Sequence, residues 1–138
     1  MSMFRKALGA LAIASAMTLT IAGTAFADIP FNQQINGPAT YYNDQGYGAC
    51  GTQIDASSQM LVAVSPSYWT ASNPNNDPLC QGVSVQVSYN GSTITVPVED
   101  QCPGCDSTHI DLSEPAFVQL AGSTDAGNIQ VTWQFVHS

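Results

Sequence analysis

Two alternating stretches near the middle of the chain constrain the fold more than any other feature. Apolar residues take every second position from Val83 to Tyr89 and again from Ile94 to Val98. A period of two is typical of half-buried β-strands. Asn90-Gly91, between the two stretches, is the residue pair that a type I′ turn prefers. The sequence therefore predicts a β-hairpin here, and Pro97, which has no N–H, predicts an edge or a bulge in its second strand.

The rest of the chain also has mostly β character. We expect strands over 39–42, 60–64 and 129–135, and an irregular arm over 28–36. One short helix is predicted from the N-cap Ser113 to a stop at Gly122. Residues 65–78 form a loop rich in Ser, Pro and Asn. Many short strands with one helix predict a small barrel or sandwich.

The N-terminus has the pattern of an export signal. Arg5 and Lys6 precede an apolar stretch over 7–22, and Ala25-Phe26-Ala27 is the small-x-small pattern that signal peptidase reads. The apolar stretch is short for a membrane span. We therefore expect residues 1–27 to be a signal peptide and residues 28–138 to form one secreted, extracellular domain.

The charge of that domain excludes several classes of partner. Both basic residues of the chain lie in the predicted signal peptide, and all ten Asp and Glu residues follow it. Binding to nucleic acid or to anionic membranes needs Lys and Arg, so neither is expected. A strongly acidic, monomeric domain would instead be steered towards a basic protein or a neutral polymer.

The cysteines predict cross-links. An even number of cysteines in an exported chain indicates two disulfides, and three pairings are possible. The Cys-Pro-Gly-Cys spacing also occurs in zinc and redox sites, but a second close pair of ligands and a thioredoxin-like context are missing. We expect no metal and no cofactor. The four residues are Cys50, Cys80, Cys102 and Cys105.

Two acidic residues stand out as candidates for chemistry. Asp100 ends the second hairpin strand, and Asp111 lies just before the predicted helix. The tight loop between them predicts that they lie near each other on one surface, as the paired carboxylates of glycoside hydrolases do. Both also suit a structural role, in which they accept backbone N–H groups. His109 is either an acid or base beside Asp111 or a solvated bystander.

Four ordered blocks resemble the double-psi β-barrel family, which includes barwin, expansins, family-45 glycoside hydrolases and the rare lipoprotein A transglycosylases. The resemblance implies a mainly β fold, a six-stranded double-psi β-barrel with one or two short helices and two disulfides. The blocks are Ala39-Thr40-Tyr41-Tyr42, Gly48-Ala49-Cys50-Gly51, Glu99-Asp100-Gln101-Cys102-Pro103-Gly104-Cys105 and Ile110-Asp111-Leu112-Ser113.

Further blocks at 47–51, 54–59, 73–80 and 108–113 are similar to those of secreted family members that inhibit papain-like cysteine proteases. This resemblance implies a non-catalytic protease inhibitor. The long loop and its aromatic residues make that loop the candidate contact surface. Its candidate contact residues are Tyr68, Trp69, Asn75, Asn76 and Asp77.

The same family implies an alternative, an expansin-like protein that binds or loosens cell-wall polysaccharide without hydrolysis. Its groove would contain Thr40, Tyr42, Asp100, His109 and Asp111. A lytic transglycosylase or glycoside hydrolase is less expected. The family's hydrolase base falls at Asn43, which cannot act as a base, and Asp44 would point to the opposite side of a strand.

The resemblance to barwin implies a disulfide pairing. It joins Cys50 to Cys102 and leaves Cys80 for Cys105. This pairing is favoured over Cys50–Cys80 with Cys102–Cys105.

Overall fold

The computed structural model describes residues 29–138, so the predicted signal peptide lies outside the described residues. Within this range no helix is long and apolar enough to cross a membrane. The elements are β1 (Ile35–Tyr42), β2 (Gln45–Tyr47), β3 (Gln53–Asp55), β4 (Val62–Val64), the 3-10 helices η3 (Pro66–Tyr68), η4 (Pro74–Asn76) and η5 (Pro78–Cys80), β5 (Val83–Tyr89), β6 (Ser92–Gln101), β7 (Ile110–Ser113), α2 (Glu114–Ala121) and β8 (Ile129–His137).

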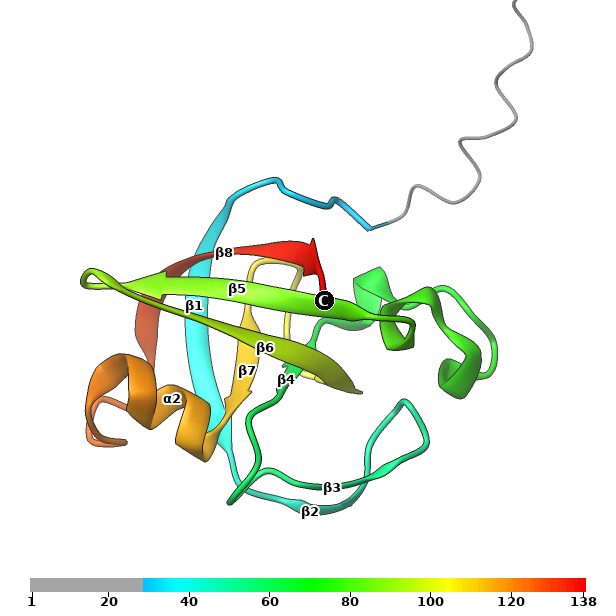
Figure 1. Cartoon of the computed structure of the whole chain (residues 1–138), viewed down its shortest axis with the longest axis horizontal. Coiled ribbons are helices and arrows are strands. Elements are labelled where there is room, and N and C mark those ends of the chain that lie inside the picture. Colours follow the sequence, from blue (N-terminus) through cyan, green and yellow to red (C-terminus); the bar gives the residue numbers. More distant parts are fainter. Residues whose placement is uncertain (1–28) are drawn as a thin grey trace, which may run out of the picture.

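Six of the strands close into one barrel in the order β1-β7-β4-β6-β5-β8 (Figure 1). β1 runs parallel to β7 and β4 runs parallel to β6, whereas the other neighbouring pairs are antiparallel. β2 and β3 pair only with each other and lie outside the barrel. The closed mixed barrel confirms the predicted fold class.

The predicted hairpin is the β5–β6 pair. Asn90 and Gly91 have φ values of 48° and 83°, as a type I′ turn requires. Pro97 pairs with Ser84 of β5 and has no partner on β4, so β6 is unpaired on one side at this residue, as the proline predicted. Pro97 lies just before Val98, the first residue of β6 that pairs with β4, and the register shifts directly after that pair.

This shift leaves one extra residue in β6. Val62 pairs with Val98 and Ala63 pairs with Asp100, so Glu99 has no partner on β4. Strict alternation after the buried Val98 would turn Asp100 into the barrel interior. The bulge instead re-aims the side chain, and both acidic residues reach the outer surface. The bulge thus places Asp100 on the same face as Ala63, with which it pairs.

The barrel interior is filled by apolar side chains of all six strands and of α2, and Trp133, Phe117 and Phe135 are its largest buried members. The Trp133 indole donates a hydrogen bond of 2.9 Å to the carbonyl oxygen of Thr108. This bond fixes the loop before β7 against β8, and the same loop carries His109.

The boundaries of two strands differ from the prediction. β1 begins at Ile35 because it pairs with β8 from Ile35 to Ala39, a long-range contact that a local pattern does not reveal. β4 begins at Val62, two residues later than expected. The helix agrees with the prediction: it follows Ser113, and Gly122 ends it with a φ of 87°. The predicted loop over 65–78 contains short 3-10 helices.

The disulfide pairing taken from barwin is wrong. The bonds join Cys50 to Cys80 and Cys102 to Cys105. A tight turn, in which the Cys105 N–H donates to the Cys102 carbonyl, brings that pair to a Cα separation of 5.4 Å. The loop that carries Cys80 packs against the loop that carries Cys50, at 5.6 Å between the Cα atoms. Both separations suit a disulfide.

Candidate functional site

A row of paired residues crosses four strands on the outside of the barrel. Thr40 in β1 pairs with Asp111 in β7, Asp111 pairs with Ala63 in β4, and Ala63 pairs with Asp100 in β6. Residues paired across a sheet point to the same face. The two acidic residues therefore flank Ala63, and their strands lie about 10 Å apart, which is two inter-strand spacings.

Thr40 connects His109 to Asp111. Its hydroxyl donates to Asp111 Oδ1 over 3.0 Å and lies 2.8 Å from His109 Nε2. A hydroxyl has one hydrogen to donate, so His109 must donate from Nε2 in this arrangement. The predicted proximity of His109 and Asp111 thus becomes a hydrogen-bonded chain through Thr40.

Asp100 is held by three hydrogen bonds. Its Oδ2 accepts from the Tyr42 hydroxyl at 3.0 Å, and its Oδ1 accepts from the N–H groups of Ala49 and Gln101 at 3.0 and 2.9 Å. The carboxylate therefore fixes the chain just before Cys50. Burial and the charge of Asp100 raise the pKa of Tyr42, which keeps this hydroxyl protonated as a donor.

Asp111 lies in a less polar environment. Burial raises its pKa above the ordinary value, the hydrogen bond from Thr40 and the charge of His109 oppose that rise, and the charges of Asp44 and Asp100 add to it. A half-buried carboxylate with a raised pKa, placed among other carboxylates, is typical of functional sites, although structural networks also produce it.

Asn43 and Asp44 follow the aromatic pair Tyr41-Tyr42, where the family's hydrolases keep their base. The Asn43 amide donates to Glu114 Oε1 at the start of α2, over 3.1 Å. Asp44, which also follows the end of β1 at Tyr42, does not share this contact of Asn43. Asp44 instead lines a pocket of about 240 Å³ together with Tyr42 and Asp100.

The β2–β3 hairpin, residues 45–55 and here called the outer hairpin, covers one side of this row. It has a small core of its own, formed by Ile54, Ala56 and Leu61, with Tyr42 packed against it. Gly48 lies so close to β6 that an added Cβ would come within 2.5 Å of the Glu99 carbonyl oxygen. Glycine is therefore required where the outer hairpin meets the barrel.

The predicted protease-contact residues fall into two groups. Tyr68 and Trp69 are half-buried against the barrel core, and the Tyr68 ring packs edge-on to Phe135 at 4.9 Å. Asp77 is fully buried and accepts from the N–H groups of residues 70, 71 and 79. Asn75 and Asn76 are exposed. The first three residues thus shape the loop, and the two asparagines form its outer surface.

This loop and the outer hairpin form one continuous surface. The Asn75 side chain lies over Gly51, where an added Cβ would come within 2.7 Å of it, and the Cys50–Cys80 disulfide joins the two segments alongside. Tyr47, whose side chain is 78% exposed on β2, is not among the predicted protease-contact residues. Its place in a Gly-rich segment, far from any alternating pattern, was the available signal.

Among residues 29–138 no group of three or more His, Cys, Asp or Glu side chains is arranged to hold a metal ion. The groups that the row of paired residues brings together are hydrogen-bonded carboxylates, hydroxyls and one imidazole. These groups bind hydroxyl-bearing or cationic ligands.

Comparisons with known proteins agree with this architecture. A family model described as "Lytic transglycolase" matches residues 34–133. The papain inhibitor of Streptomyces mobaraensis is 61% identical over 126 residues, which cover 90% of this chain and 87% of that protein. The solved structure of the Streptomyces papain inhibitor aligns with a TM-score of 0.77 and 63% identity, covering 79% of this chain and 99% of that one.

A second kind of solved structure is also similar. A mutant of the Clavibacter michiganensis expansin in complex with cellohexaose aligns with a TM-score of 0.61 and 32% identity, covering 76% of this chain and 51% of that one. The two kinds of similar protein correspond to the two functions that the sequence predicted.

Proposed function

The chain belongs to the double-psi β-barrel family that the lytic transglycolase model represents, and from that premise we propose that it is a secreted, non-catalytic inhibitor of papain-like cysteine proteases. The observation that carries the proposal is the 61% identity with the Streptomyces mobaraensis papain inhibitor. The match takes in most of that inhibitor's length and is not confined to a short motif. Fold alone would not support an activity, because one fold carries many functions.

The structure supports a mode of binding for this inhibitor. Protease inhibitors bind tightly when a rigid surface complements the enzyme and little ordering is needed on binding. Here the closed barrel holds Asn75 and Asn76 beside the outer hairpin, and the Cys50–Cys80 disulfide fixes the two segments together. Tyr47 supplies an exposed aromatic side chain on β2 of the same hairpin. We assign the protease contact to this surface.

Titration of papain with the purified protein tests the proposal. We expect papain activity to fall to near zero as micromolar protein is added. Full papain activity at that concentration would contradict the proposal.

The Tyr47→Ala variant tests the assigned surface. Aromatic anchors at interface centres often contribute 2 kcal/mol or more, so inhibition should weaken by about 30-fold. Val118→Ala is the matched control, because Val118 is the other large apolar side chain that is exposed in the described residues, and it lies on α2. Equal inhibition by both variants would move the contact away from the outer hairpin.

A second candidate function is binding of cell-wall polysaccharide in the groove formed by Thr40, Tyr42, Asp100, His109 and Asp111. The row of hydroxyl and carboxylate groups and the similarity to an expansin solved with cellohexaose favour it. Pull-down on cellulose, chitin and peptidoglycan, with Asp111→Asn as the variant, tests this candidate. Binding that is lost only in the variant supports it.

Catalysis is not part of the proposal, because the position of the hydrolase base is Asn43 and its amide is bonded to Glu114. Asp44 lines the neighbouring pocket, however, so the assay must include product analysis. Reducing ends or anhydro-sugars released by the wild type and not by Asp111→Asn would overturn the non-catalytic assignment.

A further inference from the structure

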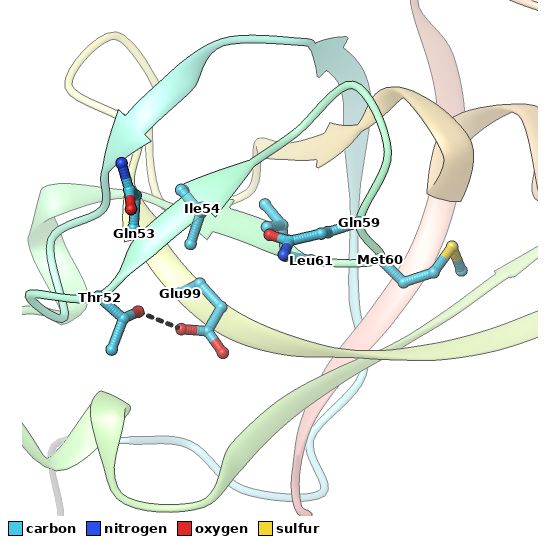
Figure 2. Close-up of a pocket in the computed structure, with 7 residues that line it drawn as sticks. All are labelled: Thr52, Gln53, Ile54, Gln59, Met60, Leu61 and Glu99. Carbon is cyan, nitrogen blue, oxygen red and sulfur yellow. Dashed lines mark hydrogen bonds between the residues drawn. The ribbon is translucent and has the colours of Figure 1, made fainter.

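A second pocket lies between the outer hairpin and β6, apart from the groove with Asp111. It has a volume of about 320 Å³ and is larger than the pocket beside Asp100. Figure 2 shows Thr52 and Glu99 at one end, Gln59 and Met60 at the other, and Ile54 between them. We call it the β3 pocket. It is lined by Thr52, Gln53, Ile54, Gln59, Met60, Leu61 and Glu99.

Among the half-buried carboxylates in residues 29–138, Glu99 has the weakest hydrogen bonding. Its one hydrogen bond comes from the Thr52 hydroxyl over 3.4 Å, which is long for an O–H···O bond. Asp100, its neighbour in sequence, accepts three bonds of 2.9 to 3.0 Å. An ionised carboxylate has about four acceptor positions. Glu99, which lines the pocket, therefore keeps most of its hydrogen-bonding capacity available to a ligand.

The described part of the chain has no lysine or arginine to offer Glu99. The two basic residues of the chain are Arg5 and Lys6, so residues 29–138 contain no lysine or arginine. Of the two histidines, His109 is bonded to Thr40, and the His137 ring stacks on Phe31 at 3.9 Å. Because residues 29–138 leave Glu99 without a cationic partner, we expect the positive charge that pairs with it to come from another molecule.

The walls of the pocket match a long cationic side chain. Ile54 and Leu61 are buried apolar side chains, against which an aliphatic stem packs. The side-chain oxygen of Gln59 accepts a hydrogen bond from the Asp55 N–H. The side-chain NH₂ groups of Gln59 and Gln53 remain able to contact polar groups of a ligand. No aromatic ring lines the pocket, and sugars are usually held by stacking on one. Its volume is at the small end of the range of about 300–1,000 Å³ for ligand sites.

We propose that the β3 pocket binds the side chain of a lysine or arginine of the partner protease, with its charge paired to Glu99. The inference rests on the proposed function for the source of that side chain. It adds to the exposed Tyr47 surface a charged contact that sets the orientation of the complex and its dependence on salt.

An NMR titration tests the pocket directly. The probe is Nα-acetyl-arginine amide, and Nα-acetyl-citrulline amide is its uncharged match. We expect saturable shifts of the Gln53 and Gln59 side-chain amides with arginine amide only, and loss of those shifts in Glu99→Gln. Absence of shifts, equal shifts with both probes, or shifts that persist in Glu99→Gln would overturn the inference.

Papain inhibition tests the source of the side chain. Glu99→Gln should inhibit about tenfold more weakly at about 50 mM salt, and the difference should shrink at about 500 mM, where charges are screened. Asp125→Asn is the matched control, since it removes the same charge from the exposed loop between α2 and β8, and it should change inhibition less than about twofold.

The outcomes separate the two proposals. If the wild type does not inhibit papain, the proposed function fails, and the titration alone decides whether the pocket binds cations. If the wild type inhibits and Glu99→Gln inhibits equally well, the protease side chain is not bound there, and this inference fails while the proposed function stands.

Discussion

The barrel and the outer hairpin hold themselves together in different ways. The barrel is a closed sheet around a large apolar core that includes Trp133, Phe117 and Phe135. The outer hairpin has strands of three residues and a core of three buried side chains, and it relies on Asp100, close glycine packing and one disulfide. Stability and surface shape therefore depend on separate sets of residues. The difference predicts which substitutions unfold the molecule and which only loosen its binding surface.

The largest effect should come from the barrel core. Phe135→Ala leaves a cavity where the ring now contacts Trp133 and Tyr68, so the free energy of unfolding should fall by about 3–5 kcal/mol. Urea denaturation followed by tryptophan fluorescence measures the change. The fraction that remains folded should inhibit papain as the wild type does. A loss below about 1 kcal/mol would mean that the barrel is not the main source of stability.

The second-largest effect should come from removing the disulfide between the outer hairpin and the loop that carries Cys80. The double variant Cys50→Ser with Cys80→Ser opens a disulfide that joins residues 30 apart in sequence. The free energy of unfolding should fall by about 3.5 kcal/mol on the chain-entropy estimate. Inhibition should weaken as well, because Asn75 is no longer held over Gly51. The matched control is Cys102→Ser with Cys105→Ser, which opens a separation of three and should cost about 2 kcal/mol. Equal losses would speak against a bridging role of the first bond.

A smaller effect is expected from the core of the outer hairpin. Ile54→Ala should cost about 2 kcal/mol, the low end for such a change, because few side chains surround it. Hydrogen exchange should become faster at Gly48 and Ala56, whose N–H groups bond to Thr52 and Asp44. Amides of β5 should keep the protection that they have in the wild type. Uniformly faster exchange would show that the hairpin and barrel unfold together.

The smallest effect is the pH dependence of Asp111. Its ordinary pKa is 3.8 and the folded state raises it, so folding binds this proton more tightly than the unfolded chain does. Its contribution to stability is therefore full below about pH 4 and is lost as pH rises through the raised pKa. Asp111→Asn removes this loss, so its stability relative to the wild type should increase from pH 4 to pH 7.

Urea denaturation at several pH values measures this difference. Asp125→Asn, the control for charge, should show a difference that changes little with pH. A pH-independent difference for Asp111→Asn would mean that burial does not perturb this carboxyl group.

Local patterns predicted most of the barrel. The alternation in β5, β6 and β8, the turn at Asn90 and the stop at Gly122 are signals contained within a few residues. The first residues of β1 could not be predicted in the same way. They are strand because β8 lies beside them, and a pairing partner about a hundred residues away leaves no trace in a short window.

The candidate site was predicted in part. Thr40, His109 and Asp111 do lie together, as the resemblance implied. Aromatic residues in a loop do not reveal from sequence whether they are exposed, so the partial burial of Tyr68 and Trp69 could not be predicted. A signal for the bulge existed. Asp100 falls where the alternation of β6 calls for an apolar side chain, which indicates an extra residue in the strand.

The extra residue in β6 is one that the barrel itself does not need. Without Glu99, Asp100 would follow Val98 directly, and regular alternation would still turn its side chain to the outer face opposite Ala63. What the bulge adds is therefore a second carboxylate at the same end of the strand, that of Glu99 in the β3 pocket.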